Sequence, residues 1–303
     1  MSDNTEFRKE LEERTKQINE QIESYLPEEK GHQKTIFEAM NYSVKAGGKR
    51  LRPLFMQEIC RLFTGEVQPV VVPFMAAIEM IHTSSLVHDD LPCMDDDMMR
   101  RGQASTWAEY GEDMGVLAGD ALMIYAFEVA AKAFKEVSDA DDLKRVGRAI
   151  EILASKTGIY GMIGGQTVDV ELAGGPIPKN KLDFIYRLKT GALIEASMLI
   201  GAVLGGAAEE DCKIVESLAG KVGLAFQIQD DILDVTGDQE VLGKEAGSDE
   251  KNQKTTYVTL EGLEKAKKDV EALSVQAIED LNKLPGNNEF RSEERRVGKE
   301  CRS

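Results

Sequence analysis

The sequence predicts an all-α fold, a single-domain helical bundle around a central cavity. Long segments with apolar residues at helical spacing are joined by short turns, and no stretch alternates apolar and polar residues as a half-buried strand does. No repeat of fixed period is present, and 1 Trp and 10 Phe among 303 residues are too few for an aromatic-rich β-sandwich. With 42% hydrophobic residues, the chain is long enough to bury one large core.

Glycine and proline mark where the expected helices begin and end. Gly47-Gly48 ends the second helix, and Pro53 is well placed to start the third, because the first turn does not need its missing N–H. The glycine-rich residues 158–174 permit close helix packing, Gly191 is expected to interrupt a helix, and residues 236–254 are a long polar loop. The expected helices cover residues 4–25, 32–46, 53–64, 68–90, 112–136, 140–157, 178–206, 209–234 and 258–283.

The composition excludes several classes of protein. Lys plus Arg total 37 against 54 Asp plus Glu, and this net charge of -17 disfavours nucleic-acid binding, which needs basic patches. No signal peptide is expected from the polar N-terminus. No apolar run of about eighteen residues lacks a charge, so no stable membrane insertion is expected. Four scattered cysteines suit a reducing, cytoplasmic location.

The last residues need a separate interpretation. Residues 291–303 resemble the translation of a sequencing adapter, so a non-native tail is expected there in place of the natural C-terminal helix. The expected domain therefore covers residues 1–290.

An acidic stretch follows the apolar helix that is expected over residues 68–90. Five aspartates fall within nine residues: Asp89, Asp90, Asp95, Asp96 and Asp97. Pro92 ends a regular helix near Asp89, which places two carboxylates at the negative end of the helix macrodipole. That arrangement is unfavourable unless a cation binds there. A solvated acidic loop is the alternative. The apolar helix before the stretch and the adjacent Arg100-Arg101 favour a cation site over such a loop.

A second acidic group lies in the helix expected over residues 209–234. Asp230, Asp231 and Asp234 fall within an arc of about 100° in a helix of 3.6 residues per turn. Mg²⁺ prefers oxygen ligands and commonly bridges carboxylates to phosphates, so two such groups facing a cavity would hold a diphosphate. A calcium-buffering protein is an alternative, but the sequence has no residues at EF-hand loop spacing. A di-iron bundle would need a second Glu-x-x-His besides the one that begins at Glu79.

Cationic residues accompany both acidic groups. Some of them would bind a second anion directly, without metal. The lysines taken singly are also compatible with a solvated surface. The cationic candidates are Lys49, Arg50, Arg52, His82, Arg100, Arg101, Lys189, Lys244 and Lys254.

With these motifs in order, the sequence resembles the short-chain trans-prenyl diphosphate synthases, of the bacterial farnesyl and geranylgeranyl diphosphate synthase kind. The resemblance covers about residues 30–285. No single motif is specific, but their order and spacing are. The matching motifs are GGKRLRP at 47–53, DDLPCMD at 89–95, RRG at 100–102, GGQTVD at 164–169, KTG at 189–191, FQIQDDILD at 226–234 and GK at 243–244.

The resemblance implies an isoprenoid-synthase helical bundle, a homodimer, and a Mg²⁺ cofactor bound as a trinuclear cluster. The metal ligands implied are Asp89, Asp90, Asp95, Asp230 and, in some members, Asp234, and the acidic pattern adds Asp231. The allylic diphosphate would be bound by Arg100, Lys189, Lys244, Thr190 and Gln227, and the isopentenyl diphosphate by Lys49, Arg52, His82 and Arg101. The implied catalytic set is Asp89, Asp90, Asp95, Arg100, Lys189, Asp230 and Lys244.

The implied reaction is ionisation, condensation and elimination. An allylic diphosphate (dimethylallyl, geranyl or farnesyl) ionises in a site that excludes water, and isopentenyl diphosphate attacks the cation. Loss of a proton then gives farnesyl or geranylgeranyl diphosphate. The chain departs from the family pattern at Val258, where a proline is common.

Chain length is expected to depend on the residues one turn before Asp89. Ser84 and Ser85 leave room for a long product, whereas Met123 or Tyr125 on another helix could block it.

Three alternatives stay open at this point. A class I terpene cyclase would lack the Lys49, Arg52 and His82 group. A non-catalytic subunit of a heteromeric synthase would have degraded aspartates. A plain metal-binding bundle would not need the cationic residues.

Overall fold

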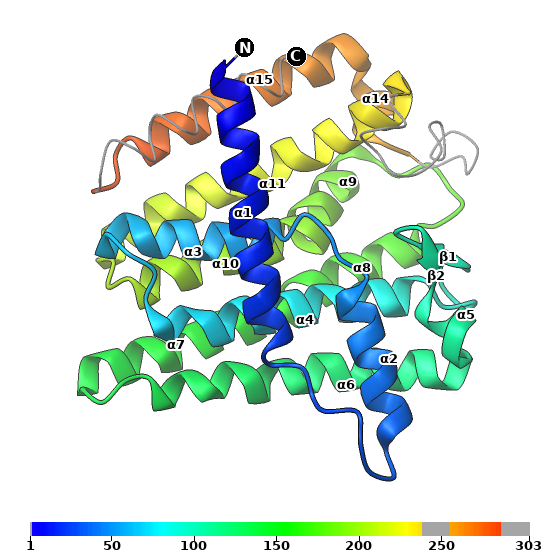
Figure 1. The fold of residues 1–303 in the computed structure, drawn as a ribbon. Helices are drawn as coiled ribbons and strands as arrows, with labels where there is room; N and C mark the ends of the chain where they lie inside the picture. The colour runs from blue at the N-terminus through cyan, green and yellow to red at the C-terminus, as the bar shows by residue number, and fades with distance from the viewer. Residues whose placement is uncertain (1, 238–254, 286–303) are drawn as a thin grey trace. The chain divides into compact units, whose positions relative to one another are not determined.

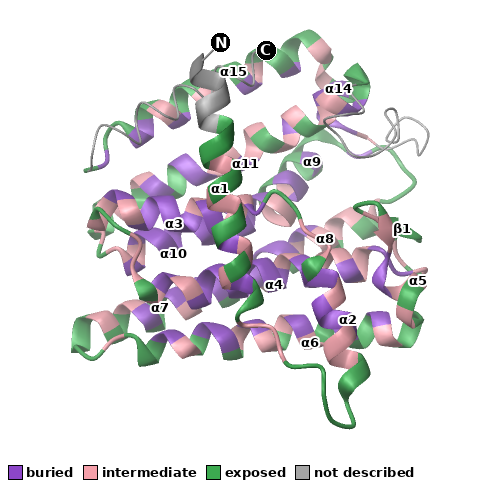
Figure 2. Ribbon diagram, in the orientation of Figure 1, coloured by how far each residue is buried: buried purple, intermediate pink, exposed green. Residues whose placement is uncertain are grey.

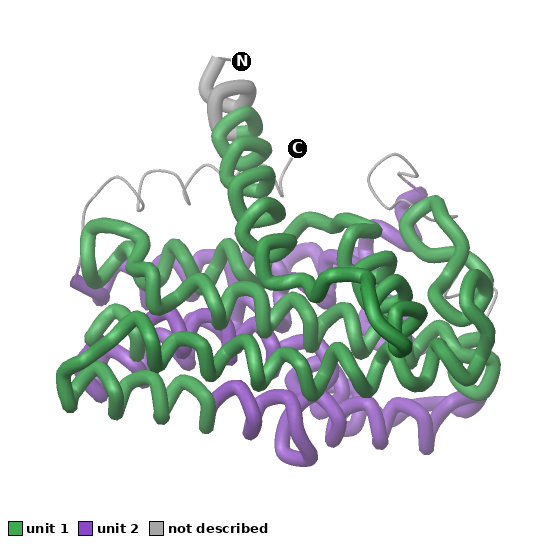
Figure 3. The backbone as a smooth tube through the Cα atoms, turned by 60° about the horizontal axis from the view of Figure 1, so that its bottom comes forward, with its two compact units in different colours: residues 1–151, 203–206 green, residues 152–202, 207–303 purple. Residues whose placement is uncertain are grey.

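The computed structural model describes residues 2–237 and 255–285, with side chains from residue 8 onward. The described chain is predominantly helical (Figure 1). It divides into two compact units (Figure 3). Unit 1 comprises residues 1–151 and 203–206, and unit 2 comprises residues 152–202 and 207–303.

The elements of unit 1 follow the predicted helices closely. They are α1 (Ser2–Glu23), α2 (Lys34–Lys45), α3 (Leu51–Thr64), a 3-10 turn (Pro69–Val71), α4 (Val72–Asp89), β1 (Met99–Arg100), β2 (Gln103–Ala104), α5 (Thr106–Tyr110), α6 (Glu112–Ala131), a 3-10 turn (Lys132–Lys135) and the first part of α7 (Ala140–Thr157).

Helix α4 is the core helix of unit 1. It packs mainly against α6, and α1, α2 and α3 also lie against it. Most of its residues are buried on every side, as the purple ribbon of Figure 2 shows. Pro69 and Pro73 stand at the beginning of their helical segments, where an N–H is not needed. The apolar run therefore forms the buried helix that the sequence predicts.

Two helical segments are long and apolar enough to cross a membrane by length and composition alone. They are Pro69–Asp89 and Glu112–Lys135, with mean hydropathies of 1.6 and 1.5. The first is 72% buried within the protein, as a core helix is, and the second is 39% buried. Because core helices of globular proteins meet the same criterion, the two segments do not by themselves indicate a membrane.

A small hairpin lies in the segment that the sequence predicts to be a loop. Strands β1 and β2 are antiparallel, with Arg100 opposite Gln103. The two residues of its turn, Arg101 and Gly102, have φ of 53° and 82°. Positive φ at both positions is typical of a type I′ turn, which matches the twist of a two-residue hairpin. Strands of two residues are too short to leave an alternating pattern, so the sequence analysis missed them.

Unit 2 contains the remaining helices, and four of them share a hydrophobic core: α9 (Lys179–Ile185), α11 (Glu209–Thr236), α14 (Tyr257–Glu261) and α15 (Leu263–Leu281). Buried side chains of this core include Ile185, Ile228, Ile232 and Val270. The elements are the end of α7, α8 (Met162–Glu171), α9 (Lys179–Ile185), the π-helix η3 (Tyr186–Gly191), α10 (Ala192–Leu204, up to residue 202), α11 (Glu209–Thr236), α14 (Tyr257–Glu261) and α15 (Leu263–Leu281).

Two helical segments of unit 2 differ from the prediction. Gly191 does not interrupt the helical backbone as expected, because the π-helix η3 continues it from α9 into α10. A π-turn inside a helix is uncommon and often marks a functional site. The helix expected over residues 258–283 is divided at Gly262, whose φ of 83° ends α14 before α15 begins. The long loop expected over residues 236–254 lies almost wholly outside the described residues.

Candidate active site

The first aspartate group is built on the C-terminal end of α4. The helix ends at Asp89, as the position of Pro92 predicts. The backbone then folds back, and the N–H of Asp95 donates to the carbonyl oxygen of Asp89 at 2.9 Å, while the N–H of Asp97 donates to that of Asp90 at 3.1 Å. These bonds satisfy carbonyls that a helix end leaves without partners. They also bring Asp95 back to the end of α4.

Asp90 and Arg100 form an ion pair in unit 1. Asp90 is only 2% exposed, and Nε of Arg100 donates to its Oδ1 and Oδ2 at 3.0 and 3.2 Å. Burial raises the pKa of the Asp90 carboxyl, and the Arg100 hydrogen bonds oppose that shift. A cation thus lies at the negative end of α4, where the sequence predicts that one is needed.

Arg101 joins the hairpin turn to the glycine-rich turn before α3. Its guanidinium donates to the carbonyl oxygen of Gly47. A Cβ on Gly48, whose φ is 136°, would lie 2.8 Å from the Arg101 Cζ. Glycine is therefore needed there for the guanidinium to approach the backbone. Partial desolvation of its guanidinium by the surrounding protein lowers the pKa of Arg101, although the residue as a whole is exposed, and the positive charge of Arg50 adds to that shift.

Arg52 and His82 lie in the same cationic region. Burial lowers the pKa of Arg52, and its Nε has no hydrogen-bond partner among the described residues. The pKa of His82 is held well below its usual value by burial and by the nearby charges of Arg52 and Arg101. His82 is therefore neutral at pH 7, and it can still donate a hydrogen bond. Lys49 is exposed at the edge of this region.

Arg50 serves a different purpose from its neighbours. Its side chain is buried and ion-paired with Glu79 of α4 at 2.6 Å. It also donates to Asn19 and to the carbonyl oxygen of Val44. Arg50 therefore holds α1, α2 and α4 together, which is a structural role and not the anion binding that the sequence predicts for Lys49 and Arg52.

In unit 2, glycines bring the KTG and GGQTVD motifs together. A Cβ on Gly165 would overlap the backbone of Lys189, so α8 and the π-helix can pack closely only with glycine there. The Lys189 ammonium donates to Asp169 at 2.6 Å. Sequence analysis missed Asp169 as a site residue, although it ends the quoted GGQTVD motif.

A second close approach joins the π-helix to α11. A Cβ on Gly223 would lie 3.0 Å from the Cα of Gly191. The hydroxyl of Thr190 donates to Oε1 of Gln227 at 3.0 Å, which links the KTG motif to the second aspartate motif.

The three aspartates of α11 have different surroundings. Asp230 is exposed, and Asp234 is 3% exposed. Asp231 is half-buried, and its Oδ2 accepts hydrogen bonds from the Tyr186 hydroxyl and from the Tyr257 N–H. Two neighbouring carboxylates that look equivalent in the sequence are thus not equivalent in the fold.

The donor groups fit Mg²⁺ in chemistry. Both aspartate groups present only oxygen donors, which this ion prefers. Within residues 2–237 and 255–285, no three His, Cys, Asp or Glu side chains are gathered for a metal. An ion that binds through one or two carboxylates, waters and a substrate's phosphates needs no such preformed cage.

The predicted site residues therefore fall into two sets. The structure brings Arg52, His82, Asp90, Arg100 and Arg101 together in unit 1, with Lys49, Asp89 and Asp95 beside them on the same connections. In unit 2 it brings together Lys189, Thr190 and Gln227, and places Asp230, Asp231 and Asp234 further along α11. Lys244 and Lys254 lie outside the described residues.

The residues predicted to limit chain length lie in unit 1. Ser84 is fully buried on α4, while Ser85 is half-buried and donates to the His82 carbonyl oxygen. The Tyr125 hydroxyl donates to the carbonyl oxygen of Tyr25, and the Lys132 ammonium lies 5.7 Å from the Tyr125 ring centroid. Those contacts hold Tyr125 against the α1–α2 connection.

Fold and site together define the class of all-helical isoprenyl diphosphate synthases. A profile of the polyprenyl synthetase family matches residues 33–286. The chain belongs to this family, and it is a prenyltransferase. The resemblance inferred from the motifs is thereby confirmed.

The similar proteins include both farnesyl and geranylgeranyl synthases. The chain is 45% identical over 247 residues to a chloroplastic geranylgeranyl pyrophosphate synthase of Catharanthus roseus, covering 81% of this chain and 68% of that protein. It is 40% identical over 281 residues to farnesyl diphosphate synthase of Escherichia coli strain K12, covering 92% of each. A crystal structure of Helicobacter pylori geranyltransferase with magnesium and isoprenyl diphosphate superposes with a TM-score of 0.78, at 32% identity and 94% coverage of each chain.

Proposed function

We propose that this prenyltransferase condenses isopentenyl diphosphate with dimethylallyl, geranyl or farnesyl diphosphate, in the presence of Mg²⁺, to give farnesyl or geranylgeranyl diphosphate. The observation that carries the proposal is the cationic region of unit 1. Arg52, Arg101 and His82 lie together there, beside the Asp90–Arg100 pair. Desolvation lowers the pKa of both Arg52 and Arg101, and a bound anion of high charge density would stabilise their charges.

The chain's own residues would divide the work between two anions. Arg52, Arg101 and Lys49 would bind the diphosphate of isopentenyl diphosphate, with neutral His82 as a hydrogen-bond donor. Arg100, Lys189 and, outside the described residues, Lys244 would bind the allylic diphosphate, and Thr190 and Gln227 would orient it. These groups hold the two substrates in place and stabilise the charge that develops on the departing diphosphate.

The aspartates would bind the metal. Asp89, Asp90 and Asp95 in unit 1 and Asp230 with Asp234 in unit 2 are the candidate ligands. Mg²⁺ bound there would neutralise the diphosphate and make it a better leaving group. For the Asp90 oxygens to bind metal, Arg100 has to release them, which frees its guanidinium for the allylic diphosphate.

The length of the prenyl product is proposed from the residues of α4 that precede Asp89. Ser84 is small and fully buried, so it offers no bulk one turn below Asp89. This favours geranylgeranyl diphosphate as the final product. The relatives do not separate the two products, because the Catharanthus and Escherichia coli proteins are 45% and 40% identical to the chain.

A terpene cyclase is the second candidate, and the same cationic region disfavours it. A cyclase ionises one allylic diphosphate and has no need for a second anion site on Arg52, Arg101 and His82. The degraded aspartates expected of a non-catalytic subunit are also not found, because Asp89, Asp90, Asp95 and Asp230 are all present. A homodimer in the cytoplasm, without nucleic-acid or stable membrane partners, completes the proposal.

The test is a direct assay. The protein is incubated with radiolabelled isopentenyl diphosphate, with dimethylallyl or farnesyl diphosphate, and with Mg²⁺, and the products are separated by chain length. Elongation that stops when Mg²⁺ is chelated supports the proposal. A protein that elongates neither starter would contradict it. Light scattering of the same sample tests the homodimer.

A further inference from the structure

Tyr257, the first residue of α14, is held by groups from three other helices. Its backbone N–H donates to Oδ2 of Asp231 in α11 at 2.7 Å, and its hydroxyl donates to Oδ2 of Asp269 in α15 at 2.7 Å. The hydroxyl of Tyr186, at the start of the π-helix, lies 3.3 Å from the same N–H. We call Tyr186, Asp231, Tyr257 and Asp269 the Tyr257 clasp.

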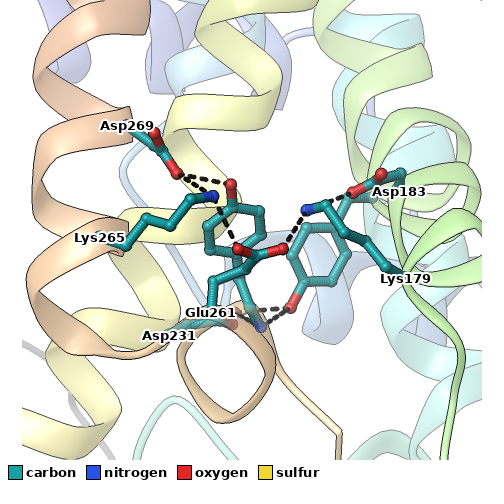
Figure 4. Close-up of polar contacts among 8 residues, drawn as sticks. Lys179, Asp183, Asp231, Glu261, Lys265 and Asp269 are labelled. Carbon is teal, nitrogen blue, oxygen red and sulfur yellow. Dashed lines mark hydrogen bonds and ion pairs between the residues drawn. The ribbon is translucent and has the colours of Figure 1, made fainter.

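Two ammonium groups flank the ring of Tyr257. Lys179 lies 4.4 Å and Lys265 lies 5.7 Å from the ring centroid. Glu261 accepts from both, at 3.1 Å from Lys179 and 2.7 Å from Lys265, and Figure 4 shows its carboxylate between them. Cation–π contacts and ion pairs thus reinforce the clasp around the Tyr257 ring.

Asp231 is the centre of the clasp. Its Oδ2 accepts at 2.6 Å from the Tyr186 hydroxyl as well as from Tyr257. The N–H groups in the first turn of a helix have no partner within that helix, so Asp231 supplies one from outside. Helix α14 has only five residues, too few to be stable without such tertiary contacts.

The preceding residue has the opposite environment. Asp230 is exposed, and its carboxylate has no hydrogen bond or ion pair within the described part of the chain. One residue along an α-helix turns the side chain by about 100°. Asp230 and Asp231 therefore point to different surroundings, although the sequence presents them as a pair.

We propose that Asp231 is a positioning residue that holds α14 against α11, and that it does not bind the metal. Its Oδ2 accepts two hydrogen bonds from protein donors. The exposed Asp230 carboxylate has no such donor among the described residues, which would leave it available to a cation. The metal half of this inference rests on the proposed function, and the positioning half does not. It replaces the expectation, which the acidic pattern of the sequence suggested, that Asp231 is a metal ligand together with Asp230 and Asp234.

Hydrogen exchange in the metal-free protein tests the positioning half. Asp231→Ala removes the acceptor of the Tyr257 N–H and is expected to speed exchange of that amide by about tenfold, as the loss of a helix cap does. Tyr186→Phe leaves all carboxylates in place and is expected to speed it less. Asp230→Ala is the matched control on the adjacent residue and should leave the rate unchanged. Unchanged exchange in Asp231→Ala would overturn the proposal.

Metal binding tests the other half without turnover. Mn²⁺ is titrated, in the presence of inorganic pyrophosphate, into the wild type, Asp230→Asn and Asp231→Asn. In Asp231→Asn the side-chain amide oxygen can still accept from Tyr257, so the clasp persists in that variant. Asp230→Asn is expected to weaken Mn²⁺ binding at least tenfold, and Asp231→Asn less than twofold. Equal weakening by both variants would make Asp231 a ligand and overturn the proposal. Failure of the proposed function itself would show separately, as a wild type that does not elongate its substrates.

Discussion

Arg50 donates to Glu79 at 2.6 Å, and both side chains are only 2% exposed. Arg50 adopts a left-handed backbone conformation, with φ of 49°, just before α3 begins. That conformation is uncommon for a residue with a side chain, and it is kept only where surrounding contacts stabilise it. The pair attaches the turn that contains Lys49 and Arg52 to helix α4. His82 lies on the same helix, one turn beyond Glu79.

Breaking this pair from one side should destabilise unit 1 strongly. Glu79→Ala leaves the Arg50 charge buried without its partner, and we expect a loss of about 3–5 kcal/mol in the free energy of unfolding. Replacing both residues together, with Arg50→Met and Glu79→Leu, should cost less because no charge stays buried. Urea unfolding followed by circular dichroism measures both. As a control, Lys30→Ala breaks an exposed pair with Glu28 and should not shift the midpoint. Equal losses in the single and double variants would count against this account.

His82 should make stability depend on pH. Its pKa in the folded protein lies well below the usual value of about 6.5, so the unfolded chain binds a proton that the folded one does not. The free energy of unfolding should therefore fall as the pH drops below about 6.5. His82→Asn should reduce that slope between pH 7.5 and 5.5, whereas His32→Asn, at an exposed position, should keep it. A slope that is the same in all three proteins would refute the prediction.

Arg100 should compete with the metal for Asp90. Arg100→Met leaves the buried Asp90 carboxylate without its guanidinium partner, so the variant should be less stable than the wild type by about 1–3 kcal/mol. A divalent cation can then take the vacated position. We expect MgCl₂ to raise the Tm of Arg100→Met more than that of the wild type, which differential scanning fluorimetry measures. Asp90→Asn with Arg100→Met is the control, and it should lose this added response.

Ser84 should set the chain length of the product. Ser84→Phe adds a bulky ring at a position that is already fully buried. We expect the variant to stop at farnesyl diphosphate under conditions in which the wild type forms geranylgeranyl diphosphate, with a shift of at least tenfold in the product ratio. Tyr125→Phe, which loses only the hydrogen bond to Tyr25, should leave that ratio unchanged. Thin-layer chromatography of the dephosphorylated products distinguishes the outcomes, and a wild type that forms only farnesyl diphosphate would refute the pocket-depth argument.

The elements that periodicity predicts are those whose signals are local. The helix predicted over residues 140–157 coincides with α7, and α4 ends at Asp89, just before Pro92, because backbone sterics at proline act over a few residues. The hairpin at Arg101-Gly102 and the division at Gly262 were missed. Both depend on positive φ angles that surrounding contacts help to stabilise, and the sequence pattern did not signal them.

By itself, the sequence determined the all-helical class, the order of the motifs and the family, since these depend on helical spacing and on residue types that can be read directly. Only the tertiary structure decided which members of each motif are available to a ligand. Arg50 stands between Lys49 and Arg52 and yet is a buried structural residue, and Asp231 holds α14 while Asp230 is exposed. The physical reason is that the role of a charged side chain depends on the partner that meets it. Glu79 and Tyr257, which meet these two, come from segments distant in the sequence.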